Sequence, residues 1–304
     1  MADWFWRRLT HGTQHLRQHA SWAPFATPGW GERCLAVGQD HPLYAKQGRT
    51  ITPWAAEQDG HSLALFLKSH YRQPRWRGLL AALFPSGDWS PALEEWTNLS
   101  WAHNQGVPVP LPVAAGQLVG PWGKLQSFLA VENLIGMAAL HEAIPIAEAA
   151  LDAATFRSWK KGLAVELARL SRLLHDRRRF HKDLYLCHFF IAEDDCRNPP
   201  ADWRGRVRMI DLHRLAHHPI TWRWWQAKDL GQLLFSSFWP GVDDRDRLAF
   251  WRAYFGPARR SFAVRMLAKV VRFRAKKYLR HEQRPKHRDA QPSETSTMQH
   301  HDAM

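Results

Sequence analysis

The sequence predicts an α+β protein of two lobes, a β-rich lobe followed by a mainly helical one, and two observations lead to this prediction. Between residues 33 and 67, short apolar runs are separated by turn-forming residues, which is the pattern of antiparallel hairpins. Between residues 156 and 175, leucines recur at the spacing of one helix face. The 304 residues, 45% of them hydrophobic, can supply a buried core. We place the two lobes at residues 25–132 and 133–256.

The elements of the first lobe follow in order along the chain. The apolar run at residues 62–67 predicts a strand that ends on Lys68. A first-turn proline, early acids and apolar residues at helical spacing predict a helix from Pro91 to Leu99. Residues 111–119 and 124–131 predict two further strands around a Gly-Pro-Trp-Gly turn. The helix at residues 156–175 then leads into a polar loop in the second lobe.

Three further segments flank the two lobes. Residues 1–24 are rich in Trp, Arg and His without a strand pattern, and predict a leader that is either a short amphipathic helix or disordered. Residues 257–282 predict a basic amphipathic helix, because Phe262 and the apolar residues after it recur at helical spacing. Residues 283–304 are polar and lack core-forming residues, so we expect a disordered tail.

Positive charge gathers at the C-terminal end. The chain has a formal net charge of +14, and residues 257–288 hold twelve Lys and Arg against one acid, Glu282. Such a segment predicts attraction to a polyanionic partner. Two interpretations of the basic helix stay open: it lies on an anionic membrane, or its apolar side packs on the helical lobe while its charges are solvated.

Three features of the sequence indicate the cellular compartment in which the protein is expected. Three cysteines without paired spacing support neither a disulfide framework nor a zinc site. The longest apolar stretches, such as residues 79–84, fall short of the roughly 20 residues that a membrane span needs. The first residues lack the features of an export signal. A cytoplasmic protein is therefore expected.

Two carboxylates occur in the pattern that phosphoryl transfer requires. Asp183, in the segment His181-Lys182-Asp183, occupies the place of a catalytic base that accepts the proton of an incoming hydroxyl. Asp211 ends a short apolar strand 28 residues later, as a magnesium ligand does. The order helix, polar loop, strand pair and helix is that of a protein-kinase-like helical lobe.

The first lobe supplies a candidate for the remaining requirement, a cation on the nucleotide phosphates. Lys68 closes a strand from which its amine can reach the α- and β-phosphates. A glutamate on the next helix holds such a lysine in a kinase, and by position Glu94 and Glu95 are equal candidates.

His188 departs from the general kinase pattern. It lies five residues after Asp183, where an asparagine usually binds the second magnesium. Imidazole matches Mg²⁺ less well than an oxygen ligand does. Taken alone, the histidine indicates a degraded kinase, a single-metal enzyme, or a side chain that hydrogen-bonds a ligand water.

Together these segments resemble the Kdo/WaaP lipopolysaccharide kinase family, whose members carry histidine at this position. The resemblance spans roughly residues 45 to 240. It is carried by the following matches: His181-x-Asp183-x-Tyr185-x-x-His188-Phe189, Ile210-Asp211-Leu212-His213-Arg214, Lys228-Asp229-Leu230, Gly48-Arg49-Thr50, Phe66-Leu67-Lys68-Ser69-His70 and Glu95-Trp96. It implies a protein-kinase-like bilobal fold and an active enzyme, with His188 a metal-site residue.

The resemblance also implies roles for single residues. Glu95, rather than its neighbour, holds the lysine, and Glu132 ends the strand and hinge against which adenine packs. Gly48 is the one glycine suitably placed for the phosphate-covering loop, where a plain hairpin glycine is the alternative. Asp229 holds the backbone of the catalytic loop.

The implied activity is phosphorylation of a heptose or Kdo hydroxyl in the lipopolysaccharide inner core, with ATP and Mg²⁺, at the cytoplasmic face of the inner membrane. Two alternatives stay open: a non-catalytic, membrane-associated kinase-like module, and a kinase of the same fold that acts on another small molecule or a protein. Binding to nucleic acid is not expected, since residues 222–225 form the only stretch of the sequence in which aromatic and basic residues are densely mixed.

Overall fold

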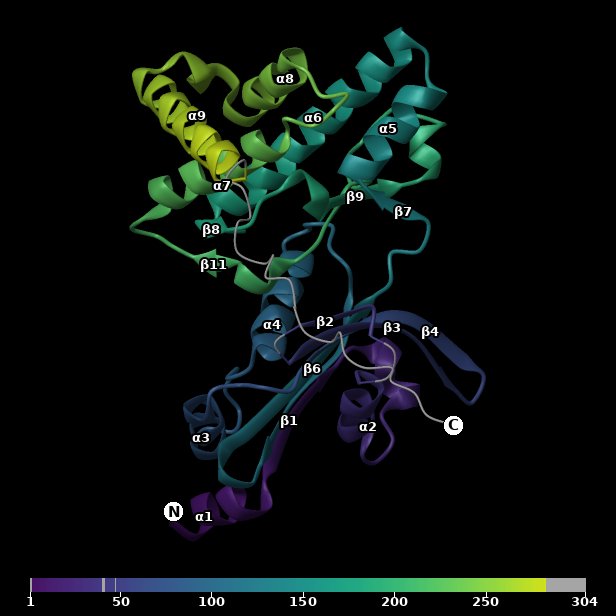
Figure 1. Ribbon diagram of the computed structural model, residues 1–304, viewed down its shortest axis with the longest axis vertical. Coiled ribbons are helices and arrows are strands. Elements are labelled where there is room, and N and C mark those ends of the chain that lie inside the picture. Colours follow the sequence, from purple (N-terminus) through teal and green to yellow (C-terminus); the bar gives the residue numbers. More distant parts are fainter. Residues whose placement is uncertain (1, 40–41, 47, 283–304) are drawn as a thin grey trace, which may run out of the picture.

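The computed structural model describes residues 2–39, 42–46 and 48–282, which form two lobes (Figure 1). The lower lobe in Figure 1 is built on a six-stranded sheet, and the upper lobe is mainly helical. The predicted α+β bilobal architecture is confirmed. The tail predicted at residues 283–304 lies outside the described residues.

The sheet of the N-lobe is antiparallel throughout, with strand order β1-β5-β6-β4-β3-β2. Its strands are β1 (Thr13–Gln18), β2 (Tyr44–Lys46), β3 (Arg49–Gln58), β4 (His61–His70), β5 (Pro112–Gly120) and β6 (Lys124–Glu132). The β3–β4 hairpin turns at Asp59 and Gly60, which both have positive φ. The predicted strands at residues 62–67, 111–119 and 124–131 are therefore confirmed.

Residues 2–24 are part of this lobe, and of the two alternatives for this segment the short helix forms and is followed by a strand. After helix α1 (Ala2–His11), β1 pairs with β5 along six residues. The 3₁₀ helix η1 (Ala20–Phe25) then places Trp22 and Phe25 in the core on one face of the sheet. Burial of these aromatic side chains fixes a segment that has no strand periodicity of its own.

Helix α2 (Trp30–Val37) covers the same face of the sheet, where strand-like runs were expected from residue 33. Its Trp30 packs edge-on against Phe128 of β6, with ring centroids 5.6 Å apart. The predicted hairpins thus begin only at β2. A short apolar run does not distinguish a strand from a buried helix, and here tertiary packing selects the helix.

Helix α4 (Pro91–Asn104) packs on the opposite face of the sheet and runs towards the C-lobe (Figure 1). Ser90 caps its N-terminus by accepting a hydrogen bond from the backbone N–H of Leu93. The predicted helix is confirmed and is longer than expected. A shorter helix, α3 (Arg75–Leu83), contacts the η2 turn (Pro121–Gly123) between β5 and β6.

The C-lobe is arranged around α6 (Ala153–Asp176), which was predicted from its leucines. Its other helices are α5 (Leu140–Ala150), α7 (Trp222–Ser236), α8 (Asp244–Phe255) and α9 (Phe262–Glu282). Its short elements are β7 (Met137–Ala139), β8 (Arg179–Phe180), η3 (Leu186–His188), β9 (Phe189–Ala192), η4 (Asp194–Cys196), β10 (Arg208–Met209), η5 (Leu212–Arg214), β11 (Ala216–His217) and η6 (Gly256–Arg260). One hydrophobic core continues from α4 and β6 into α6, so the two lobes are joined by packed side chains.

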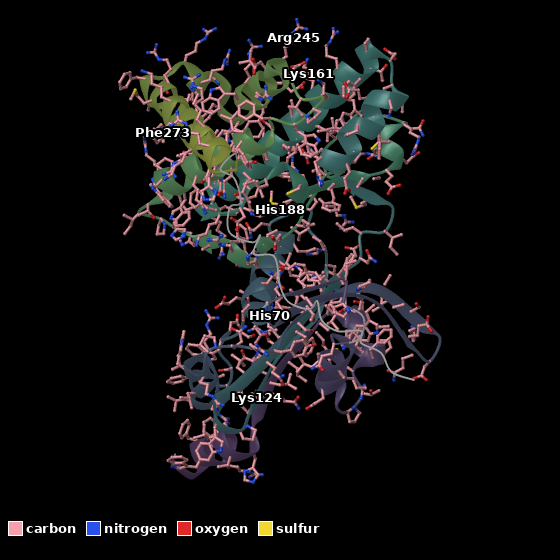
Figure 2. The ribbon with its side chains drawn as sticks, viewed as in Figure 1. His70, Lys124, Lys161, His188, Arg245 and Phe273 are labelled. Carbon is pink, nitrogen blue, oxygen red and sulfur yellow. The ribbon has the colours of Figure 1, made fainter. Side chains whose placement is uncertain are left out.

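Helix α9 packs on α7 through Val271 and Ala275, which are buried. The apolar residues that the sequence placed on one face of this helix, Phe262, Met266, Val270 and Phe273, are exposed instead. Figure 2 shows Phe273 at the outer edge of the C-lobe. The apolar stripe is therefore a surface, and a second set of residues anchors the helix. Within the described part of the chain, no helix meets the length and apolarity that crossing a bilayer requires.

Candidate active site

Lys68 and Glu95 form a buried ion pair in the N-lobe. Lys68 stands on β4, opposite Leu129 of β6, and its Nζ lies 2.6 Å from Glu95 Oε1 on α4. Their side chains are only 14% and 3% exposed. The neighbouring Glu94 pairs with Arg77 at 3.4 Å and is 45% exposed, so the structure selects Glu95 from the two adjacent acids.

The catalytic loop of the C-lobe is held by Asp229 of α7, as the resemblance implied. The carboxylate of this fully buried residue accepts hydrogen bonds from the backbone N–H groups of His181 and Lys182 at 2.8 and 2.9 Å. Lys182 has a φ of 69°, a left-handed conformation that non-glycine residues seldom adopt. The two bonds hold the backbone in this turn immediately before Asp183.

A second layer of hydrogen bonds orients Asp229 itself. His175 of α6 lies with its Nε2 3.2 Å from Asp229 Oδ2 and its Nδ1 2.6 Å from the hydroxyl of Tyr254 on α8. Gln226 donates to the same hydroxyl at 2.9 Å. The catalytic loop is therefore connected to three helices of the C-lobe through one buried network.

Asp183 directs its carboxylate toward Arg214 of η5. Arg214 Nη1 lies 3.1 and 2.9 Å from the two carboxylate oxygens, and Gln232 Nε2 lies 3.4 Å from Oδ1. Gln232 also donates to the Tyr185 hydroxyl at 2.9 Å. With 18% of its side chain exposed, Asp183 remains accessible to a hydroxyl group. It is thus oriented by neighbours and open on one side, as a general base requires.

Asp211 follows β10 with a φ of 63°. Its Oδ1 accepts a hydrogen bond from His213 Nδ1 at 2.7 Å. Burial acts to raise the pKa of Asp211, but the hydrogen bond from His213 and the charges of His213, Lys68 and His188 outweigh it and hold the pKa well below its ordinary value. Asp211 is therefore an ionised carboxylate near Lys68, so the structure brings the predicted phosphate and metal residues of the two lobes together.

His188 lies on the side of the C-lobe that faces the N-lobe (Figure 2) and contacts both carboxylate segments. Its Nδ1 donates to the backbone oxygen of Asp183 at 2.8 Å, which leaves Nε2 facing Asp211 Oδ2 at 3.8 Å. Burial acts to lower its pKa, but contacts with Cys187, the Asp183 carbonyl and Asp211 outweigh it, so the pKa of His188 is raised. The imidazole is thus held with one nitrogen directed at the carboxylate that the sequence identified as a metal ligand.

Backbone contacts join the catalytic loop to the Asp211 segment. The His181 ring nitrogen Nε2 lies 3.0 Å from the oxygen of Ile210, and the N–H of Ile210 donates to the oxygen of His188 at 2.9 Å. From the N-lobe, Asn98 of α4 donates to the oxygen of Leu212 at 3.0 Å. The loop that carries Asp183, the candidate metal ligand Asp211 and the helix that carries Glu95 therefore form one hydrogen-bonded unit.

Two of the predicted cofactor residues lie apart from this unit. The Glu132 side chain pairs with Arg208 at 3.2 Å and accepts from the N–H of Leu111 at 3.1 Å, while its own N–H donates to the oxygen of Leu111 at 2.9 Å, so a contact with a nucleotide base stays a prediction. Gly48 has a φ of 79° between β2 and β3, and a Cβ there would lie 2.8 Å from Arg72 Cγ. The turn alone explains this glycine, and a role over the phosphates stays a prediction.

The side chains present fit a magnesium site that is completed by the nucleotide. Among the described residues, no group of three or more His, Cys, Asp or Glu side chains is arranged to hold a metal by itself. Mg²⁺ in phosphotransferases takes only one or two protein ligands, with phosphate oxygens and water as the rest. Asp211 supplies the hard carboxylate oxygen that such a site needs, and His188 Nε2 lies close enough to act on the same ion or its water.

Sequence reasoning missed three residues that contact the key carboxylates: Arg214 and Gln232 on Asp183, and His213 on Asp211. Arg214 and His213 were part of the matched segment but had no role assigned. Gln232 follows Asp229 at helical spacing, and that spacing was its only signal.

The comparisons with known proteins agree with this geometry. The lipopolysaccharide kinase (Kdo/WaaP) family matches residues 41–254. Over 170 residues the chain is 29% identical to the lipopolysaccharide core heptose(I) kinase WaaP of Pseudomonas aeruginosa, covering 54% of this chain and 59% of that protein. The WaaP of Escherichia coli K12 is 33% identical over 103 residues, covering 32% of this chain and 36% of its own length.

A solved structure, WaaP in complex with acyl carrier protein, is also similar. It has a TM-score of 0.64 and 25% sequence identity, covering 88% of this chain and 98% of the matched chain. The matched regions therefore cover 98% of the chain of the solved relative, but only 59% and 36% of the lengths of the two curated relatives.

Proposed function

The chain belongs to the lipopolysaccharide kinase (Kdo/WaaP) family, and from this premise we propose that it transfers the γ-phosphate of ATP to a sugar hydroxyl, of heptose or Kdo, in the lipopolysaccharide inner core. The observation that carries the proposal is that Lys68, Asp183 and Asp211, far apart in sequence, converge where the two lobes meet. The curated relatives are named as kinases of a core heptose.

Each side chain has a defined part in this reaction. Lys68, held by Glu95, neutralises the nucleotide phosphates, and Asp183 accepts the proton of the attacking hydroxyl. Asp211 and His188 would hold Mg²⁺, which supplies charge neutralisation on the transferring phosphoryl group when it is bound. The backbone near Glu132 would receive the adenine.

The two alternatives are disfavoured by different observations. A non-catalytic module has no need for a buried Lys68–Glu95 pair or for a left-handed turn held by two hydrogen bonds before Asp183. A kinase with another acceptor would use the same machinery, so against that alternative the proposal is supported by the names of the relatives.

The proposed activity is tested with Asp183→Asn, which keeps the shape of the side chain and its contact with Arg214 but removes the base. Phosphate transfer from ATP to isolated core oligosaccharide should fall by roughly 10²–10⁴-fold. Asp176→Asn, a surface acid 63% exposed and paired only with Arg172, is the matched control and should retain full activity. Full transfer by Asp183→Asn, or none by the wild type, would refute the proposal.

We also propose a peripheral contact with the cytoplasmic face of an anionic membrane through α9. The exposed stripe of this helix, Phe262, Met266, Val270 and Phe273, is interleaved with exposed basic residues such as Arg265 and Lys269. An apolar stripe flanked by cations fits the interface of an anionic bilayer, where apolar groups insert and Lys and Arg contact headgroups. The proposed acceptor, being lipid-linked, lies at the same surface.

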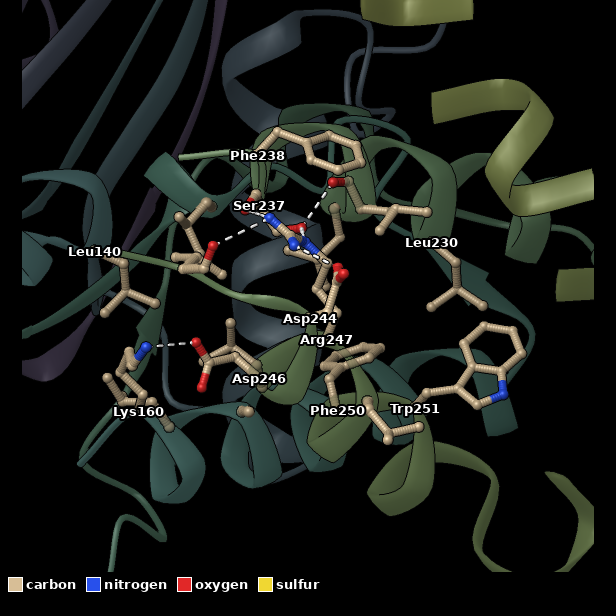
Figure 3. A pocket seen from close by; sticks show the side chains of 18 of the residues that line it. Leu140, Lys160, Leu230, Ser237, Phe238, Asp244, Asp246, Arg247, Phe250 and Trp251 are labelled. Atoms are coloured by element: carbon tan, nitrogen blue, oxygen red, sulfur yellow. Dashed lines mark hydrogen bonds and ion pairs between the residues drawn. The ribbon is translucent and has the colours of Figure 1, made fainter. Parts of the chain in front are cut away.

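A pocket in the C-lobe supports a proposed contact with acyl carrier protein. The cavity has a volume of about 590 Å³ between α5, α6, α7, α8 and α9, and its apolar lining includes Leu140 and Leu230 (Figure 3) as well as Leu163. Lys160, paired with Asp246 at 2.8 Å, lies at its edge. Its lining suits an acyl chain, and a similar structure was solved with acyl carrier protein. Native mass spectrometry with acylated carrier protein tests the contact, and Leu163→Glu should prevent it.

A further inference from the structure

Three cations surround the catalytic carboxylate. Arg214 touches Asp183 directly, while Lys182 precedes it in the chain and Lys228 of α7 donates to the backbone oxygen of Lys182 at 2.6 Å. Lys182 and Lys228 are half-buried, and the Arg214 side chain is 50% exposed. The immediate surroundings of Asp183 therefore carry more positive charge than its carboxylate can neutralise.

Two nearby carboxylates, Asp183 and Asp229, leave part of this charge uncompensated. Asp229 is fully buried, and both of its oxygens accept backbone N–H groups. In the described part of the chain, neither Lys182 nor Lys228 forms an ion pair. Burial, together with the charge of Arg214, lowers the pKa of Lys182, and burial lowers that of Lys228. Both shifts indicate cations whose environment would favour a bound anion.

Trp225 holds the two lysines side by side. The amines of Lys182 and Lys228 lie 4.6 and 5.3 Å from the centre of the Trp225 ring, and His218 stacks on the same ring at 4.5 Å. Trp225 belongs to the aromatic-basic segment that the sequence showed at residues 222–225. These contacts occupy the ring, so a ligand would meet the two amines rather than the tryptophan.

We propose that Lys182, Lys228 and Arg214 bind an anionic group, a carboxylate or a phosphate, on the acceptor next to the hydroxyl that receives the phosphoryl group. This inference rests on the proposed sugar kinase activity and adds to it a requirement for an acidic acceptor. Lys182 and Arg214 are then specificity residues, while Asp183 remains the base.

Arg214 links recognition to catalysis. It contacts Asp183 through Nη1 alone. A guanidinium carries five N–H groups, of which two are on each terminal nitrogen, so about three remain for a ligand. One arginine can therefore hold the acceptor's anionic group and the base at the same time, which fixes the hydroxyl beside Asp183. A neutral acceptor would lack this alignment.

The test compares three forms of isolated core oligosaccharide: untreated, with its carboxyl groups reduced to alcohols, and with its phosphates removed by a phosphatase. KM and kcat for each form are measured with the full-length wild type, Lys182→Gln and Arg214→Gln. Lys161→Gln and Arg245→Gln, exposed positions at the far end of the C-lobe, are matched controls (Figure 2). Thermal unfolding of each variant confirms that it is folded.

We expect Lys182→Gln to raise KM for the untreated acceptor about tenfold, because the substitution removes one charge-assisted hydrogen bond to the acceptor. KM for ATP should be unchanged. Arg214→Gln should also lower kcat. Either carboxyl reduction or phosphate removal should raise the KM of the wild type for the acceptor by a similar factor, and the treatment that does so identifies the anionic group. With that treated acceptor, Lys182→Gln should have the same KM as the wild type.

Two outcomes overturn the inference in different ways. Equal wild-type KM values for all three acceptor forms, or an equal effect of Lys182→Gln on all three, would show that no anionic group is recognised here while the kinase activity stands. Absence of transfer to every form by the wild type would refute the proposed function, and this inference with it.

Discussion

The hydrogen bonds that hold the catalytic loop converge on Asp229, so the structure predicts the effect of Asp229→Asn in detail. Its carboxylate lies 2.8 and 2.9 Å from the backbone nitrogens of His181 and Lys182, and 3.2 Å from His175 Nε2. An asparagine has the same shape but one acceptor oxygen, and its amide NH₂ would face a donor. At least one buried N–H group therefore loses its partner.

The magnitude follows from these contacts. A hydrogen bond to a charged group contributes about 1.5–3 kcal/mol, and a buried group left unsatisfied costs about 1–3 kcal/mol. We expect the free energy of unfolding to fall by about 3 kcal/mol. Without its hydrogen bond, Lys182 would leave its left-handed conformation and displace Asp183, and a shift of about 1 Å in a catalytic group costs roughly 10²-fold in kcat.

Urea unfolding and steady-state kinetics together check this prediction. Tyr254→Phe is the control, because it removes only the hydroxyl at the far end of the same network. It should cost about 1 kcal/mol and change kcat by less than about threefold. If Asp229→Asn lost stability but kept its kcat, then Asp229 would not position the catalytic loop. If its stability were unchanged, the hydrogen-bond argument itself would be wrong.

Three further predictions concern other parts of the molecule. His188→Asn should retain activity but change its magnesium dependence, because the side chain facing Asp211 changes from nitrogen to amide oxygen; superimposable magnesium titrations would argue against a metal-site role. Burial, with the charges of Arg49, Lys68 and His213, lowers the pKa of His70 to about 4, so stability due to neutral His70 is present above pH 6.5 and is lost as the pH falls towards 4. His70→Gln should reduce that acid-induced loss by about 2–3 kcal/mol in unfolding measurements across this range, and equal losses in both proteins would contradict the argument. The double substitution Phe262→Ser and Phe273→Ser should weaken sedimentation with anionic vesicles, whereas Ile220→Ser, equally apolar and 91% exposed, should not; equal binding of all three proteins would exclude α9 as the contact.

Much of the fold could be predicted from local sequence signals. The Asp59-Gly60 turn, the capped and proline-initiated start of α4 and the leucine face of α6 each specify an element within a few residues of where it occurs. The segment before residue 25 carries no such signal. Its Trp22 packs against Trp54 of β3, and its strand β1 pairs with β5, whose residues come about 100 positions later in the chain; no local pattern encodes these contacts.

For α9 too, the sequence predicted the element, but only the structure showed which of its faces is buried. Periodicity correctly predicted a helix, but it could not say which of two faces would be buried. Val271 and Ala275 lie against α7, whereas Phe262, Val270 and Phe273 remain outside. Since Val270 is exposed and Val271 is buried, packing against the neighbouring helix rather than residue type decided the orientation.

For the site, the sequence predicted which residues would carry the chemistry. Asp183 and Asp211 lie in short segments whose residue types and spacing fit phosphoryl transfer, and the family resemblance added His188 as a metal-site residue. Lys68 was identified in the same way, from its place at the end of a strand.

Only the tertiary structure decided how these residues are held and what surrounds them. It engaged the Glu132 side chain with Arg208, placed Arg214 on Asp183 beside two lysines, and paired Lys68 with the Glu95 that the resemblance had already favoured. The physical reason is that ion pairs and burial depend on distances between separate helices and strands. Those distances are set by packing of the whole core, which no single segment of the sequence contains.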